Sequence, residues 1–192
     1  MESVKKISGG ILKELYAMQE SSTGKAILSR LRNSIGRNYV DMVDIMPYVF
    51  GKLPDEFLGD SKKMTDDEIC ILTSLQLYAI YQQGEESCVY FNEEGYSNIG
   101  TSLRVLRAGD DTTAVDRRFN AMITSTEFDE LIVHLRHLIR LLKSKQKGIK
   151  VDYGRLAEDL YWIRNNKNKE NIILNWAREY YKVNSKGESN EQ

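Results

Sequence analysis

The sequence predicts an all-α protein, folded as a compact bundle of about eight to nine helices in two packed lobes. Apolar residues recur at intervals of three and four along most of the chain, as a helix with one buried face requires. Only two of the 192 residues are proline, and helix interiors reject proline because it lacks a backbone N–H. Hydrophobic residues make up 41% of the chain, which is enough for a core and excludes wholesale disorder.

The first half of the chain contains four predicted helices. They cover residues 4–19, a segment from the break at 21–24 to about 35, residues 41–51 with Pro47 starting a turn, and residues 66–83. The fourth helix follows a capping box formed by Thr65 and Glu68. Its apolar residues cover most of the circumference, so we expect it to be the central buried helix. A polar connector at 53–63 precedes it.

The second half repeats the helical pattern after an irregular stretch at 84–98. We take this stretch as the boundary between an N-terminal lobe, residues 1–90, and a C-terminal lobe, residues 95–182. Predicted helices cover 99–106, a segment capped by Thr113, a long segment ending near Lys145, a segment capped by Asp152, and a last segment from Ile172 to Tyr181. Residues 183–192 are polar, and we expect a flexible tail.

Several classes of protein are excluded by simple counts. Lys and Arg total 27 and Asp and Glu total 28, which gives a net charge of -1 and excludes a globally basic nucleic-acid binder. Cys70 and Cys88 are too few for a disulfide framework, so we expect reduced, structural thiols. The N-terminus lacks an apolar signal region, and no run of 18 apolar residues exists. We therefore expect a cytoplasmic protein without membrane contact.

Residues that would support catalysis are sparse. The only histidines, His134 and His137, follow Glu130 on one predicted helix. A di-iron bundle needs a second Glu-x-x-His motif, which is missing. The Ser22–Lys25 segment resembles the end of a Walker A loop but lacks its first glycine and the Ser or Thr after the lysine. We therefore expect no catalytic residues, metal or cofactor. An enzyme of the helical metal-hydrolase class is the alternative, and metal analysis of the purified protein would decide it.

The charges are distributed unevenly along the chain. Residues 21–40 and 131–150 contain several Lys and Arg and no acid. Arg136, Arg140, Lys143 and Lys147 are spaced by four, three and four, so they fall within about 60° of one another on a helix. A leucine stripe at 131, 135, 138 and 142 lies roughly 120° away. This helix is therefore predicted to present leucines inward and a cationic ridge outward.

Arg and Lys bind nucleic-acid phosphates without reading sequence, and the chain contains no RNA-recognition or zinc motif that would add specificity. The candidate nucleic-acid-binding residues are Lys25, Arg30, Arg32, Arg37, Arg104, Arg107, Arg117, Arg118, Arg136, Arg140 and Lys143. We expect replacement of Arg136, Arg140 and Lys143 by alanine to leave the fold intact. The alternatives are a solvated helical surface and a helical protein-interaction module without a nucleic-acid role.

Several segments, taken in order, resemble the CasB family, the small subunit of the type I-E CRISPR Cascade complex. These segments are Thr23–Arg32, Leu77–Gln83, Asn98–Leu106, Asp116–Met122, His134–Leu142, Val151–Leu160 and Trp176–Tyr181. Two positions depart from the pattern: Tyr81 stands where the family often has His, and Thr101 where members often carry a basic residue. The second departure removes one expected phosphate contact.

The resemblance implies a non-catalytic, all-helical subunit, present as two copies in a guide-RNA complex. It implies that the partners are the subunits that coat the guide RNA, the large subunit, a second copy of the chain, the guide RNA and the target DNA backbone. It also implies a role in antiviral defence, namely holding target DNA open and binding the displaced strand. Because exchange of a DNA duplex for a guide–target duplex is nearly balanced in energy, a few sequence-independent phosphate contacts can stabilise the R-loop.

Overall fold

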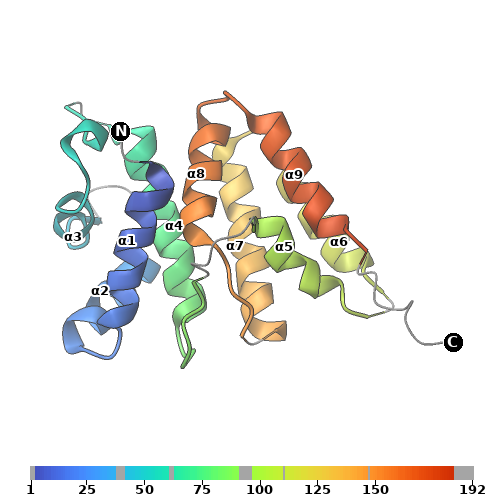
Figure 1. Ribbon diagram of the computed structural model, residues 1–192, viewed down its shortest axis with the longest axis horizontal. Coiled ribbons are helices and arrows are strands. Elements are labelled where there is room, and N and C mark those ends of the chain that lie inside the picture. Colours follow the sequence, from blue (N-terminus) through green and yellow to red (C-terminus); the bar gives the residue numbers. More distant parts are fainter. Residues whose placement is uncertain are drawn as a thin grey trace, which may run out of the picture.

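The computed structural model describes residues 3–37, 42–60, 63–90, 97–109, 111–146 and 148–183, and within these ranges it is all-α, as predicted (Figure 1). The helical segments are α1 (Val4–Ala17), α2 (Ser22–Asn33), α3 (Met46–Phe50), the 3-10 helix η2 (Asp55–Phe57), α4 (Asp66–Gln82), α5 (Ile99–Leu103), the 3-10 helix η3 (Arg104–Arg107), α6 (Thr113–Ile123), α7 (Phe128–Lys145), α8 (Tyr153–Arg164) and α9 (Lys169–Tyr181).

Side-chain caps fix the starts of several helices, because they bind backbone N–H groups that have no partner within the helix. The Thr65 hydroxyl accepts a hydrogen bond from the N–H of Glu68, whose carboxylate accepts one from the N–H of Thr65, so the predicted capping box of α4 is confirmed. Asp152 caps α8 as predicted. The predicted cap at Thr113 is wrong: this residue lies inside α6, and Asp111 accepts from its N–H at 2.9 Å.

Helix α4 lies at the centre of the fold. Every residue from Cys70 to Gln82 is buried, because α1, α2, α7 and α8 all pack against it. Outside this centre, α5 packs against α9 and α6 against α7, which places the last helices on the opposite side from α1 and α2 (Figure 1). The prediction that this helix is central and buried is therefore confirmed. The division into lobes 1–90 and 95–182 remains a prediction.

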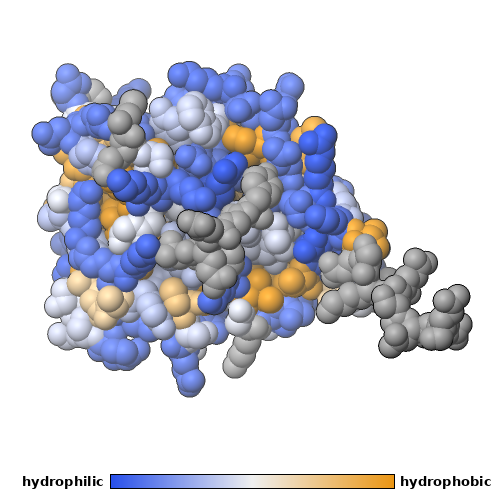
Figure 2. Space-filling view, viewed as in Figure 1, coloured by the Kyte–Doolittle hydropathy of each residue, from blue (hydrophilic) through white to orange (hydrophobic). Residues whose placement is uncertain are grey.

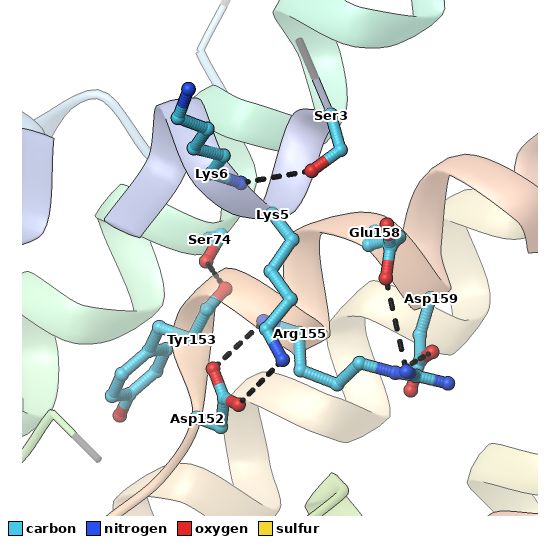
Figure 3. A network of polar contacts seen from close by, with 9 residues as sticks. All are labelled: Ser3, Lys5, Lys6, Ser74, Asp152, Tyr153, Arg155, Glu158 and Asp159. Atoms are coloured by element: carbon cyan, nitrogen blue, oxygen red, sulfur yellow. Dashed lines mark hydrogen bonds and ion pairs between the residues drawn. The ribbon is translucent and has the colours of Figure 1, made fainter. Parts of the chain in front are cut away.

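A polar network connects the start of α8 to α1 and to α4 (Figure 3). The buried hydroxyl of Ser74 on α4 donates to the carbonyl of Tyr153 at 2.6 Å. Lys5 of α1 pairs with Asp152 at 3.5 Å, and Arg155 donates to the buried carboxylate of Asp159 at 2.9 Å. These bonds satisfy polar groups that would be costly to bury alone, and those of Ser74 and Lys5 fix the position of α8 relative to α4 and α1.

The connection between α4 and α5 approaches the start of α8. The N–H of Val151 donates to the carbonyl of Val89 at 2.9 Å, next to an isolated parallel bridge between Tyr90 and Val151. Cys70 and Cys88 are free thiols, as predicted. Lys147 and residues 184–192 of the predicted tail lie outside the described residues. None of the described helices is long and apolar enough to cross a lipid bilayer.

Candidate nucleic-acid interface

The surface is largely polar, and the face drawn in Figure 2 is mostly hydrophilic with small, separate apolar patches. A nucleic-acid interface must therefore be found from the arrangement of cations. The eleven predicted residues lie on three parts of the fold: Lys25, Arg30, Arg32 and Arg37 on or just after α2, Arg104 and Arg107 in η3, and Arg117, Arg118, Arg136, Arg140 and Lys143 on α6 and α7.

The two arginines of η3 already have partners inside the protein. Arg107 donates to Asp116 at 2.9 Å and lies over the rings of Tyr180 and Tyr181, 5.5 and 5.0 Å from their centroids. Arg104 lies 3.9 Å from the carboxylate of Glu179. These contacts connect η3 to α6 and α9, so both side chains have a structural role here.

Lys143 also has a structural role. Its ammonium donates to the carbonyls of Ile80, at 2.9 Å, and Gln83, which lie at the end of α4 and have no intrahelical donor. Burial lowers the pKa of Lys143. Arg32 reaches the carbonyl of Ala79 at 3.5 Å, and burial lowers the pKa of its guanidinium. The cationic ridge does not face solvent along its whole length, because α7 packs against α4 on this side as well as burying its leucines.

The leucine stripe itself is confirmed. Leu131, Leu135, Leu138 and Leu142 are all buried, so the angular spacing of the leucines predicted the core face of α7 correctly. The same spacing could not predict the contacts of Lys143, because a helical wheel describes one helix and gives no information about a second neighbour.

Other cations of α7 are accessible and lie close together. Arg140 is exposed and makes no hydrogen bond or ion pair with the described part of the chain. Burial lowers the pKa of His137, and the nearby charges of Arg136, Arg140, His134 and Arg118 lower it further. The cations that act on His137 therefore lie close enough together to form a region of positive potential. It spans α6 and α7, two helices that pack together.

A groove of about 530 Å³ joins this region to the end of α2. Arg37 and Arg136 both line it, and the guanidinium of Arg136 extends toward Gly36, where an added Cβ would lie 3.9 Å from an Arg136 nitrogen. The Nε atom of Arg136 is buried and has no hydrogen-bond partner among the described residues. Arg164 also lines the groove, but it is held by Asp66 at 2.6 Å.

We define the cationic strip as Arg37, Arg118, Arg136, His137 and Arg140. Its residues come from the loop after α2 and from α6 and α7, so it is assembled by tertiary packing. Lys25, Arg30 and Arg117 are exposed outside this strip, and Lys25 lies 3.1 Å from Glu20. His137 was not among the residues predicted from the sequence, although its position between Arg136 and Arg140 was a usable signal.

Neither histidine lies in a metal-binding cluster in the part of the chain that the structure describes, where no group of three or more potential ligands occurs. His134 lies 3.8 Å from Glu130, one turn earlier on α7. The absence of a metal and of enzymatic activity remains a prediction. At the two positions that depart from the family pattern, Tyr81 is buried and its hydroxyl donates to the carbonyl of Gln146, whereas the buried hydroxyl of Thr101 has no described partner.

Comparison with known proteins gives consistent results. The chain matches the family model of CRISPR-associated protein Cse2 over residues 27–181. It is similar to the crystal structure of CasB from Thermobifida fusca, with a TM-score of 0.71 and 23% identity over 93% of this chain and 98% of that chain. It is also similar to CasB from Thermus thermophilus, with a TM-score of 0.62 and 21% identity over 91% and 97% of the two chains.

A further similar structure is a chain of a CRISPR RNA-guided surveillance complex, with a TM-score of 0.69 and 17% identity over 93% of both chains. No curated protein sequence matches the chain. The structural likenesses support the all-α fold, and the match of the family model covers well over half of the sequence. The resemblance seen in the sequence is thus confirmed, and the chain belongs to the CRISPR-associated Cse2 family, which includes CasB.

Proposed function

We propose that the chain is the non-catalytic small subunit of a type I-E CRISPR Cascade complex and that its cationic strip binds nucleic-acid backbone without reading sequence. The main observation in support of nucleic-acid binding is that these cationic side chains lie close together. Arg118 of α6 lies near His137 and Arg140 of α7, and Arg37 and Arg136 line the adjoining groove. Family membership and the similar chain in a surveillance complex support the assignment to such a complex.

In this role the four arginines of the strip neutralise phosphates of the target DNA, chiefly of the displaced strand, and so stabilise the open R-loop. Arginines suit this task because the guanidinium donates several hydrogen bonds to phosphate and stays charged. The chain as a whole carries a net charge of -1, so its affinity for free nucleic acid is expected to be weak. The other subunits, which coat the guide RNA, and a second copy of the chain would position the strip along the target.

The test replaces Arg118 and Arg140 by alanine and measures target-DNA affinity of the assembled complex across a salt series. Both side chains are exposed, so the fold should be unaffected. If both contact single-stranded phosphates, the log–log salt slope should flatten by about 1.4, from about 0.7 per contact. The loss should be equal on two unrelated target sequences, because phosphate contacts carry no base information.

The matched control replaces Lys167 and Arg178, two other exposed cations that do not belong to the strip, and removes the same charge. It should leave the slope unchanged. An unchanged slope and affinity in the Arg118 and Arg140 variant would instead favour a helical protein-interaction module. A loss that depends on the target sequence would contradict backbone binding.

A further inference from the structure

A second pocket lies away from the cationic strip, where the start of α1, the start of α4 and the end of α8 come together near the N-terminus in Figure 1. Its volume is about 240 Å³, and it is lined by Ser3, Val4, Phe57, Asp67, Glu158, Tyr161 and Trp162. The lining combines aromatic rings with carboxylates and contains no Lys or Arg.

The aromatic part offers a binding surface for a cation. Phe57 is 3% exposed and forms the buried side of the pocket, whereas Trp162 is 38% exposed. The ring of Tyr161 meets that of Trp162 edge to face, with centroids 5.2 Å apart. The face of an indole or phenol ring attracts a guanidinium or ammonium group, and the attraction is greater where water is partly excluded. Exposed Trp and Tyr beside a pocket are also typical anchors of protein interfaces.

Asp67, one of the two carboxylates of the pocket, lacks a cationic partner among the described residues. Burial raises the pKa of Asp67, and the carboxylates of Asp66, Glu68 and Glu56 raise it further. No cation of the described chain forms an ion pair with Asp67. The two neighbouring carboxylates already have partners within the protein: Asp66 binds Arg164 at 2.6 Å, and Glu68 accepts the hydrogen bond that completes the capping box of α4. A half-buried carboxylate in such surroundings is stabilised by any cation that enters the pocket.

Glu158 completes the arrangement. Its carboxylate lies 3.8 Å from the guanidinium of Arg155, whose Nε atom donates to Asp159 (Figure 3). Glu158 therefore keeps lone pairs that can accept from a second donor. A nucleic acid is excluded from this pocket, because its phosphates would lie beside Asp67 and Glu158.

We propose that this aromatic and acidic pocket binds a Lys or Arg side chain of a partner protein, with an apolar residue next to that cation packing on Trp162. The cation would lie against the rings of Tyr161 and Trp162 and pair with Asp67. The identity of the partner as a subunit of the same complex rests on the proposed function, but the pocket is independent of the cationic strip. The two surfaces would bind different partners, protein here and nucleic acid at the strip.

A photocrosslinker identifies the occupant directly. Benzoylphenylalanine in place of Trp162 keeps an aromatic group at the mouth of the pocket and reacts with what covers it in the assembled complex. We expect a crosslink to a protein segment with Lys or Arg within about two residues of the crosslinked position. A crosslink to nucleic acid, a segment without a cation, or no crosslink in an assembled complex would overturn the proposal.

A second experiment measures the binding of the purified chain to a guide-RNA complex that lacks it. The single variants Asp67→Asn and Trp162→Ala should each weaken incorporation about tenfold, the effect of losing one cation contact in a partly desolvated site. Asp67→Asn removes the charge without a change of shape. The matched control combines Glu170→Gln and Leu174→Ala, an exposed acid and an exposed apolar residue of α9, and should bind like wild type.

The outcomes separate the two proposals. If the wild-type chain joins the complex and the Asp67 and Trp162 variants join equally well, the pocket proposal is wrong and the proposed function stands. If the wild-type chain does not join a guide-RNA complex, the proposed function fails, and the partner assigned to the pocket fails with it. Thermal unfolding of each variant, compared with wild type, ensures that weaker incorporation reflects the surface. An Asp67→Asn variant that is less stable by more than about 5 °C would assign the residue to the fold instead.

Discussion

Replacing Lys143 by alanine should lower the stability of the protein, whereas replacing Arg140, one turn earlier on α7, should not. The ammonium of Lys143 donates to the carbonyls of Ile80 and Gln83 at the end of α4. A hydrogen bond from a charged donor contributes about 1.5–3 kcal/mol, and a cation at a helix C-terminus adds a few tenths through the helix dipole. Water can replace part of this bonding because Lys143 is half-exposed, so we expect a net loss of about 1–2 kcal/mol.

For a chain of this length, 1 kcal/mol corresponds to about 2–4 °C in the unfolding midpoint, so Lys143→Ala should unfold about 2–8 °C below wild type. Arg140→Ala removes an exposed side chain and should stay within about 0.5 kcal/mol of wild type. Differential scanning calorimetry at neutral pH measures both variants under the same conditions.

The two variants should show the reverse order in nucleic-acid binding. Arg140→Ala should flatten the salt dependence of target binding by about 0.7 in the log–log slope, whereas Lys143→Ala should leave the slope of the folded protein unchanged. A Lys143 variant with wild-type stability and a flattened slope would refute the assignment of this residue to the helix end. The expectation that a triple replacement of Arg136, Arg140 and Lys143 leaves the fold intact is accordingly revised.

Three further predictions follow from the packing and the pKa shifts. A Cβ at Gly100 would lie 2.0 Å from the carbonyl oxygen of Trp176, so Gly100→Ala should lower the free energy of unfolding by about 1–3 kcal/mol, measured by denaturant unfolding. Gly10 has open space around it, so Gly10→Ala should raise the free energy of unfolding by up to about 1 kcal/mol. The folded pKa of His137 lies below its ordinary value of 6.5, so the unfolded chain takes up the proton first as the pH falls, and the stability present above pH 6.5 is lost below it. His137→Gln should reduce this pH dependence in urea titrations, and an identical profile would contradict it. The buried Nε1–H of Trp176 donates a hydrogen bond to Asp159 at 2.7 Å. Asp159→Ala removes this acceptor and should lower the free energy of unfolding by about 2–3 kcal/mol, whereas Asp159→Asn keeps an acceptor and should lower it less.

Local sequence sets much of the helical pattern, although the segment predicted at 41–51 is α-helical, among its described residues, only over Met46–Phe50. The spacing of apolar residues sets which face of a helix is buried, as the leucine stripe of α7 shows. The capping box at Thr65 and Glu68 and the cap at Asp152 are each formed by residues within one turn of each other, so a local sequence pattern is enough to predict them. Thr113 failed as a cap because Asp111, Thr112 and Asp116 offer competing local bonds. Asp116 is in addition bound by Arg107 and by the hydroxyl of Tyr180, which comes from α9.

The two surfaces proposed to be functional are assembled by tertiary packing. The angular spacing of Arg136, Arg140 and Lys143 is a property of one helix, whereas their exposure depends on α4, which takes Lys143 as a cap for its last turn. The strip likewise needs α6 to bring Arg118 beside His137. The acidic pocket draws on residues 3, 57, 67 and 158–162, which no periodicity relates to one another. A sequence therefore determines which side chains can carry charge on a helix, but only the contacts between helices determine which of those charges remain available to a partner.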